Sequence, residues 1–249
     1  MIARTILVTG AATGVGAAVV RRLAAPGVAI LAHTRKNEAA LESVANEGRA
    51  RGAKIATMLG DLAEPSIAAA LVAAAMDRFG RLDVVIANAG FADRTPAESL
   101  TDEAFDRSIQ AMPASFLRLA GAAVAHLRRG SDPRIIAVSS FVAHAYRPGF
   151  PLFPASAAAK AGLEALVRAL AIEFAPAMTV NAVAPGFVRK DAGAHAAMSA
   201  AGVGERLRQI PMGRVAEPAD IAAAIAFFAS PDAGYITGQV LHVDGGLVM

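Results

Sequence analysis

The chain has 249 residues, of which 55% are hydrophobic and 18% charged, with a formal net charge of +3 and a mean hydropathy of +0.46. It contains no cysteine, which excludes disulfides and thiolate chemistry and fits the cytoplasmic location that we expect. The basic residues are scattered without an aromatic platform, and no apolar run is long enough to cross a membrane, so we expect neither nucleic acid nor a membrane as a partner.

Short apolar runs typical of strands alternate with helical patterns along the chain. The expected strands are 6–8, 28–33, 54–59, 82–87, 134–138, 179–183 and 240–243. The expected helices are 14–25, 37–51, 66–79, 101–128, 156–175 and 217–229. Strands that are apolar almost throughout predict a parallel sheet covered on both faces. Right-handed crossovers then give a doubly wound, Rossmann-type α/β fold with three layers, which we expect to form a single domain over 1–249.

The strand at 6–8 runs into a glycine-rich turn that opens a helix. Gly10 can take a tight turn because it has no Cβ, and Gly14 and Gly16 allow phosphates and the strand to approach the start of the helix. The helix N-terminus offers free N–H groups and a partial positive charge to an anion. We therefore predict that this turn binds the pyrophosphate of a dinucleotide. The other turn residues assigned to the cofactor are Thr13 and Val15.

Ligands bind beyond the carboxyl ends of the strands in such a sheet. The second strand ends at Thr34, where an acidic residue would favour NAD, and Arg35 and Lys36 follow it. Their charges either receive the 2′-phosphate of NADP or are ordinary charges at a helix start. NADP is therefore the predicted cofactor, with NAD as the alternative.

The third and fourth strands also end in residues suited to a cofactor. Asp61 either accepts a hydrogen bond from the adenine amino group or caps the next helix. Asn88 is predicted to hydrogen-bond the backbone across the strand ends, and the small residues after it let a cofactor lie against the main chain. The further cofactor contacts predicted here are Leu62, Ala89 and Gly90.

Hydroxyl groups mark the fifth strand end, where Ser139 and Ser140 follow the strand. Ser156 and Lys160 lie four residues apart, so they share one face of the next helix and can converge on these serines. The sixth strand is followed by a Pro185-Gly186 turn. No His, Asp or Glu spacing points to a metal site.

Together, these motifs resemble the classical short-chain dehydrogenase/reductase family, especially its 3-oxoacyl-carrier-protein-reductase-like branch. The motifs that match, in chain order, are Thr9–Gly16, Asn88–Gly90, Pro185–Gly186 and the C-terminal strand. The resemblance implies an NAD(P)-dependent oxidoreductase that acts on a carbonyl or alcohol of a small, largely apolar substrate and assembles as a homotetramer or dimer. It also implies a substrate lid at 187–213 and nicotinamide contacts from Pro185, Gly186 and Val188.

The family's catalytic quartet is Asn, Ser, Tyr and Lys, and this chain retains part of it. Ser140 fits the serine, which holds the substrate oxygen, and Lys160 fits the lysine, which binds the nicotinamide ribose. Ser156 stands at the tyrosine position and Met112 at the asparagine position, while Lys190 replaces a threonine that follows Pro-Gly. Ser156 either contributes as a much poorer acid than a phenol or merely begins a helix.

Other residues offer partial substitutes for the missing groups. Tyr146, in the segment 141–155, either swings in to supply a hydroxyl or is a surface tyrosine, and His144 beside it is a weaker acid–base candidate. Pro113 lacks an N–H and predicts a distorted helix through 109–113.

Two other functions stay open. The altered site favours a dinucleotide-binding homologue with little or no redox activity that acts by binding a ligand or partner. The other open function is that of a non-redox lyase or dehalogenase on the same fold.

Overall fold

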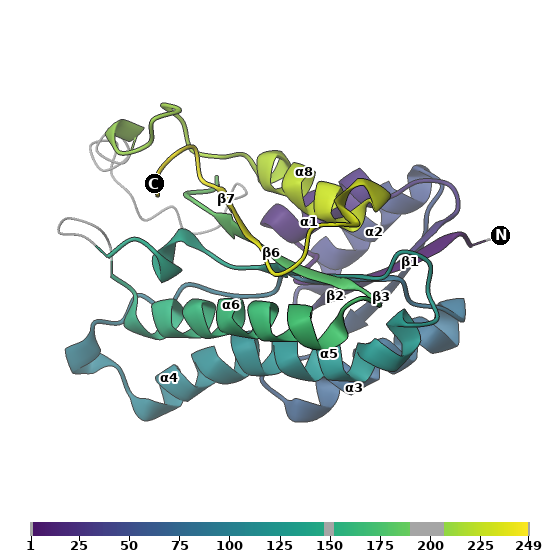
Figure 1. Ribbon diagram of the computed structural model, residues 1–249, viewed down its shortest axis with the longest axis horizontal. Coiled ribbons are helices and arrows are strands. Elements are labelled where there is room, and N and C mark those ends of the chain that lie inside the picture. Colours follow the sequence, from purple (N-terminus) through teal and green to yellow (C-terminus); the bar gives the residue numbers. More distant parts are fainter. Residues whose placement is uncertain (1, 147–151, 190–206, 249) are drawn as a thin grey trace.

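The computed structural model describes residues 2–146, 152–189 and 207–248. One sheet of seven strands, ordered β3-β2-β1-β4-β5-β6-β7, runs through the centre of the molecule, and all its neighbouring strands are parallel (Figure 1). The order reverses direction between β1 and β4, as in a doubly wound fold. The strands are β1 (Arg4–Thr9), β2 (Val28–Thr34), β3 (Lys54–Leu59), β4 (Val84–Ala87), β5 (Arg134–Val138), β6 (Thr179–Pro185) and β7 (Val240–Val243).

Helices cover both faces of the sheet, so the three-layer prediction is confirmed (Figure 1). One layer holds α1 (Gly14–Leu23), α2 (Glu38–Ala50) and α8 (Pro218–Ala229). The other holds α3 (Pro65–Phe79), α4 (Asp102–Ile109), α5 (Ser115–Leu127) and α6 (Pro154–Phe174). Short helical turns lie at η1 (Ala97–Ser99), η3 (Phe141–Ala143) and η4 (Pro231–Ala233).

Two apolar cores form because strand side chains alternate between the faces of the sheet. On β1, Val8 packs into the core under α1, α2 and α8, whereas its neighbour Leu7 packs into the core under α3, α5 and α6. Phe116 of α5 and Leu163 of α6 fill the second core. Burial of these side chains provides the main drive for stacking the layers.

The long helix expected at 101–128 is interrupted, as Pro113 predicts. A π-helical segment, η2 (Gln110–Ala114), separates α4 from α5. Pro113 cannot donate a backbone hydrogen bond, which favours the wider turn. The predicted distortion is therefore confirmed, and it places Met112 fully inside the protein.

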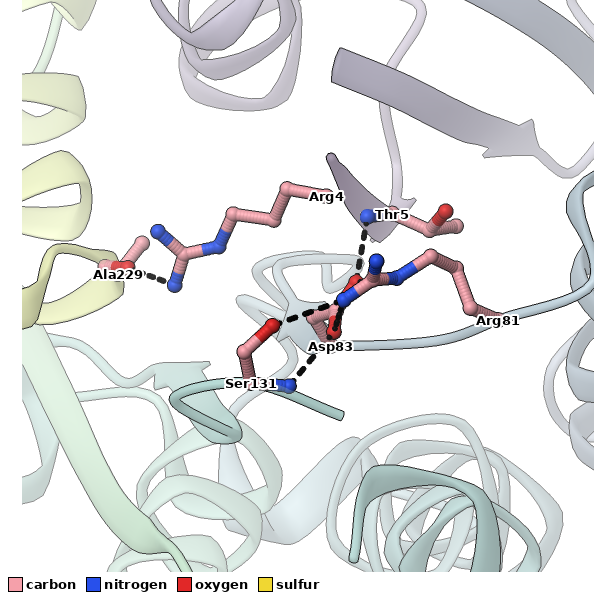
Figure 2. Close-up of polar contacts among 6 residues, drawn as sticks. All are labelled: Arg4, Thr5, Arg81, Asp83, Ser131 and Ala229. Carbon is pink, nitrogen blue, oxygen red and sulfur yellow. Dashed lines mark hydrogen bonds and ion pairs between the residues drawn. The ribbon is translucent and has the colours of Figure 1, made fainter. Parts of the chain in front are cut away.

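A buried carboxylate, Asp83, ties the amino ends of the central strands together (Figure 2). It accepts hydrogen bonds from the backbone N–H groups of Thr5 (2.7 Å) and Ser131 (3.1 Å) and from Nη2 of Arg81 (2.7 Å). Arg4, drawn beside it, donates to a main-chain carbonyl at the end of α8. These polar contacts stabilise the amino ends of the strands, which lie opposite the candidate site at the carboxyl ends.

Candidate functional site

A cleft of about 620 Å³ opens at the carboxyl ends of the strands, where the sheet order reverses. The predicted cofactor residues that line it are Gly10, Thr13, Val15, Thr34, Arg35, Asp61, Leu62, Asn88, Ala89 and Gly90. The lining residues that the sequence analysis missed are His33, Gly60, Phe91, Arg107 and Ala111. Four separate motifs thus share one cavity.

The glycine-rich turn has the backbone that its sequence predicts. Gly10 and Gly14 have φ values of +67° and +55°, in the left-handed region that favours glycine. A Cβ placed on Gly16 would lie 2.1 Å from the carbonyl oxygen of Gly10, so only glycine lets α1 begin this close to β1. The turn therefore exposes the N-terminus of α1 to the cleft, which fits an anionic diphosphate.

Asn88 holds the turn from the neighbouring strand. Its Nδ2 donates to the carbonyl oxygens of Thr9 (2.9 Å) and Gly10 (3.1 Å), which confirms the predicted bridge across the strand ends. In return, the hydroxyl of Thr9 accepts from the backbone N–H groups of Asn88 and Ala89, both at 3.1 Å. The cavity floor is thus fixed before any ligand arrives.

The cleft beyond β2 and β3 carries a charge cluster on Asp61. This carboxylate accepts from Ala63 N (3.0 Å) in the turn before α3, and it forms ion pairs with Arg107 (2.8 Å) and Arg35 (4.0 Å). It does not cap α3, whose N-cap residue is Glu64. Burial would raise the pKa of Asp61, but the hydrogen bonds from Arg107 and Ala63 and the charge of Arg35 lower it overall. Arg107 was not predicted because it lies on α4, 46 residues from Asp61 in the sequence, and only the fold brings the two together.

Lys160 lies beside the Asn88–Gly90 motif. Its Nζ donates to the carbonyl oxygen of Val138 (2.6 Å), and the residue is only 6% exposed. A Cβ placed on Gly90 would lie 3.1 Å from this Nζ, so the glycine allows the close approach. Burial lowers the pKa of Lys160 to about 8, although the nearby Glu164 carboxylate opposes the shift. The ammonium is therefore a poorly solvated cation.

Ser140 and a network behind it continue the site at the end of β5. The Ser140 hydroxyl accepts from Val142 N (3.4 Å) at the start of η3, which leaves its own proton to donate. Ser139 donates to Oε1 of Glu164 (2.5 Å), and Nε2 of His144 contacts the same oxygen at 2.8 Å. Glu164 was not among the predicted site residues, although it lies four residues after Lys160 on the same helix.

Ser156 has a different place from the one expected for a catalytic hydroxyl. Its Oγ accepts from the backbone N–H of Asp93 (2.8 Å) and donates to the carbonyl oxygen of the same residue (3.4 Å), and the serine is 2% exposed. Helix α6 begins at Pro154, so Ser156 lies in its first turn, close to the helix start that the alternative predicted. The hydroxyl instead anchors the loop after β4, and this geometry does not support the predicted catalytic role.

Tyr146 is 63% exposed, which matches the surface alternative and not a phenol packed into the site. At the sixth strand end, a Cβ on Gly186 would lie 2.8 Å from Cα of Asp244, so Pro185-Gly186 packs tightly against the chain after β7. Val188 forms a bridge with Ala216. Lys190 and most of the expected lid at 187–213 lie outside the described residues.

Within the described residues, no three His, Cys, Asp or Glu side chains are grouped as metal ligands. None of the helices described there is long and apolar enough to cross a membrane.

Comparisons with known proteins agree with this geometry. A family profile described as enoyl-(acyl carrier protein) reductase matches residues 10–248. The 3-oxoacyl-[acyl-carrier-protein] reductase FabG of Vibrio cholerae is 33% identical, covering 99% of this chain and 98% of its own, and the 3beta-hydroxysteroid dehydrogenase 1 of Eggerthella lenta is 35% identical, covering 99% and 94%. The short-chain dehydrogenase/reductase structure from Serratia marcescens has a TM-score of 0.89 at 30% identity, covering 98% and 97%. The chain therefore belongs to the short-chain dehydrogenase/reductase family and is an NAD(P)-dependent oxidoreductase.

Proposed function

We propose that this protein uses NADP(H) to reduce the carbonyl group of a small, largely apolar molecule, or to oxidise the corresponding alcohol. The observation that carries the cofactor choice is that Thr34 and Arg35 line the cleft where an acidic residue would select NAD. An apolar cluster at the other end of the site, with Phe141, Val142 and Phe187, supports the apolar substrate.

Arg35 is suited to a phosphate because its side chain is 52% exposed and lies 4.0 Å from Asp61, at the outer limit of an ion pair. Arg107 makes the closer pair with Asp61, at 2.8 Å, and so offsets the negative charge that would repel a phosphate. The guanidinium of Arg35 can then bind a 2′-phosphate through paired N–H donors.

The residues that fit a dinucleotide suggest a division of roles. When bound, the nicotinamide ring supplies or accepts a hydride. We assign Lys160 to the sugar next to that ring and the free O–H of Ser140 to the substrate oxygen. Pro185, Gly186 and Val188 stay predicted nicotinamide-side contacts, and 187–213 stays the predicted lid. Ser156, at the tyrosine position implied by the family resemblance, is committed to Asp93 and leaves the proton donor to be found.

Exposed apolar side chains support the assembly of this chain into an oligomer. Leu117 and Ile172 are exposed on α5 and α6, and Tyr235 and Leu241 are exposed near β7. We propose that such surfaces pair in a homotetramer or dimer of this single-domain, cytoplasmic protein. Light scattering gives the oligomer mass directly.

The cofactor choice is tested with Arg35→Ala. The dissociation constant for NADPH, followed by fluorescence, should rise about tenfold or more, while that for NADH changes less than about threefold. Arg22→Ala, on the exposed side of α1, is the matched control. An equal loss of affinity for NADPH and NADH in Arg35→Ala would refute a contact between Arg35 and the 2′-phosphate.

Two observations favour a weakly active or redox-silent homologue as the second candidate. The hydroxyl at Ser156 is occupied by Asp93, and Tyr146 is exposed. A panel of aldehydes and ketones, followed by loss of NADPH absorbance, separates the two functions. Tight NADPH binding without turnover of any carbonyl would favour the second candidate.

A further inference from the structure

Behind the substrate end of the site, Glu164 is a buried carboxylate that holds two groups on one oxygen. Oε1 accepts from the Ser139 hydroxyl at 2.5 Å and contacts Nε2 of His144 at 2.8 Å. Oε2 faces Arg168 at 3.6 Å, one helical turn further along α6. The carboxylate side chain is 3% exposed, whereas the imidazole of His144 is 24% exposed. The pair thus has one buried and one accessible member.

These contacts determine where the proton lies on His144. An ionised carboxylate only accepts hydrogen bonds, so Nε2 must carry a proton to bind Glu164. In the neutral imidazole, Nδ1 is then the nitrogen with a free lone pair, and in the charged form both nitrogens donate. A carboxylate that orients a histidine in this way is the arrangement that prepares imidazoles for proton transfer.

His144 also lies close in the chain to the proposed substrate-binding hydroxyl. Ser140 precedes the short turn η3 and His144 follows it, so the two residues flank a single turn of the backbone. Ser139, next to Ser140, shares Glu164 Oε1 with His144. One buried carboxylate therefore contacts His144 and the residue that precedes Ser140.

The charges that face the pair come from two elements. From α6, Glu164 faces the Lys160 ammonium, on which it acts electrostatically, and the guanidinium of Arg168 at 3.6 Å. From β7, the ring of His242 meets His144 edge-on at 4.5 Å between centroids, and Nδ1 of His242 lies 3.6 Å from Asp244. Two imidazole–carboxylate pairs thus meet ring to ring.

We propose that His144, oriented by Glu164, is the acid–base group that exchanges the proton of the redox reaction in this protein. The inference rests on the proposed carbonyl reduction. The other candidates are less well placed, because the Ser156 hydroxyl is bound to Asp93 and Tyr146 is largely exposed.

The proton balance is simple. Reduction of a carbonyl adds a hydride to carbon, taken from NADPH, which becomes NADP⁺, and a proton to oxygen. Imidazolium at His144 gives that proton from Nδ1 and is left neutral, with Nε2–H still bound to Glu164. A proton from the solvent then binds Nδ1 and restores the imidazolium, so the net reaction consumes one hydride and one solvent proton. In alcohol oxidation, the neutral Nδ1 accepts the proton instead.

The first test does not need turnover. Imidazole NMR spectra of the whole protein compare the wild type with Glu164→Gln. The ring ¹⁵N signals of His144 should change in the variant, because the carboxylate that binds Nε2–H is lost. The same signals should also differ between NADP⁺ and NADPH, because only NADP⁺ carries a positive ring. Ring signals that respond to neither change overturn the proposal.

The second test measures turnover of a carbonyl that the wild type reduces. His144→Gln should lower kcat by about 10²- to 10⁴-fold and remove one limb of the pH profile, while the NADPH dissociation constant stays within about threefold. His126→Gln, the same change in α5, is the control and should keep kcat. Two results would overturn the role of His144 and leave the proposed reduction standing. One is full activity in His144→Gln with an unchanged pH profile, and the other is loss of activity in Tyr146→Phe. If the wild type reduces no carbonyl, the proposed reduction fails, and the NMR comparison of NADP⁺ with NADPH decides whether His144 belongs to the site.

Discussion

The hydroxyl of Ser156 accepts a hydrogen bond of 2.8 Å from the backbone N–H of Asp93, and so ties the first turn of α6 to the loop after β4. That loop begins with the Asn88–Gly90 motif, and α6 carries Lys160 one turn further on. The contact therefore joins two of the segments that frame the proposed cofactor site. A residue at the position expected for a proton donor has a structural task here.

Removing this anchor should lower stability. Ser156→Ala leaves Asp93 N without its partner, so we expect the free energy of unfolding to fall by about 1–2 kcal/mol. Urea denaturation measures the change. Ser230→Ala, which removes an exposed hydroxyl bonded to Phe227, is the control and should cost less than about 0.5 kcal/mol. Unchanged stability together with a hundredfold loss of kcat would instead make the Ser156 hydroxyl a catalytic group.

Two glycines of the glycine-rich turn should respond differently to substitution by alanine. In Gly16→Ala, the new Cβ meets the Gly10 carbonyl at 2.1 Å, so α1 must move and NADPH binding should weaken by more than about tenfold. In Gly14→Ala, nothing lies within 4 Å of the new Cβ, and the cost is about 1 kcal/mol of backbone strain at a φ of +55°. Fluorescence titration with NADPH and thermal melting separate the two. Equal affinity in both variants would contradict this account of the turn.

The sheet was predictable because each strand is a short apolar run whose side chains alternate between two cores. The interruption at η2 was predictable too, since Pro113 forces a local break whatever packs around it. The contacts that define the site's chemistry were not. The partners Ser156 and Asp93 are 63 residues apart, and Glu164 and His144 are 20 apart, so their meeting depends on how α6 packs against two loops. Local patterns carry no record of that packing.

Asp83 offers a stability test far from the site. It is fully buried and accepts from two backbone N–H groups and from Arg81, so Asp83→Asn replaces an acceptor oxygen with a donor NH₂ group that faces other donors, and it leaves the Arg81 cation unpaired (Figure 2). We expect a loss of about 3 kcal/mol in the free energy of unfolding by urea. Asp77→Asn, on the exposed side of α3, should change it by less than about 0.5 kcal/mol. A loss below that control value would show that the Asp83 charge is dispensable.

The buried ammonium of Lys160 should lower the free energy of unfolding by an amount that depends on pH. Burial lowers its pKa from 10.5 to about 8, so the unfolded chain binds more protons between these values and wild-type stability rises with pH across that window. Lys160→Met removes the buried charge. We expect it to raise the free energy of unfolding by about 2 kcal/mol at pH 7 while abolishing NADPH binding.

The advantage of Lys160→Met should shrink between pH 8 and pH 10, because the wild-type lysine becomes neutral there and no longer carries its desolvation penalty. Urea denaturation at pH 7 and pH 10 measures both differences. Lys54→Met, at the exposed start of β3, controls for the loss of a surface charge. Two outcomes would contradict this prediction: a variant that is less stable than the wild type at pH 7, or a stability difference that is the same at both pH values. Either would show that the Lys160 ammonium beside Gly90 is well solvated and that its burial does not lower stability.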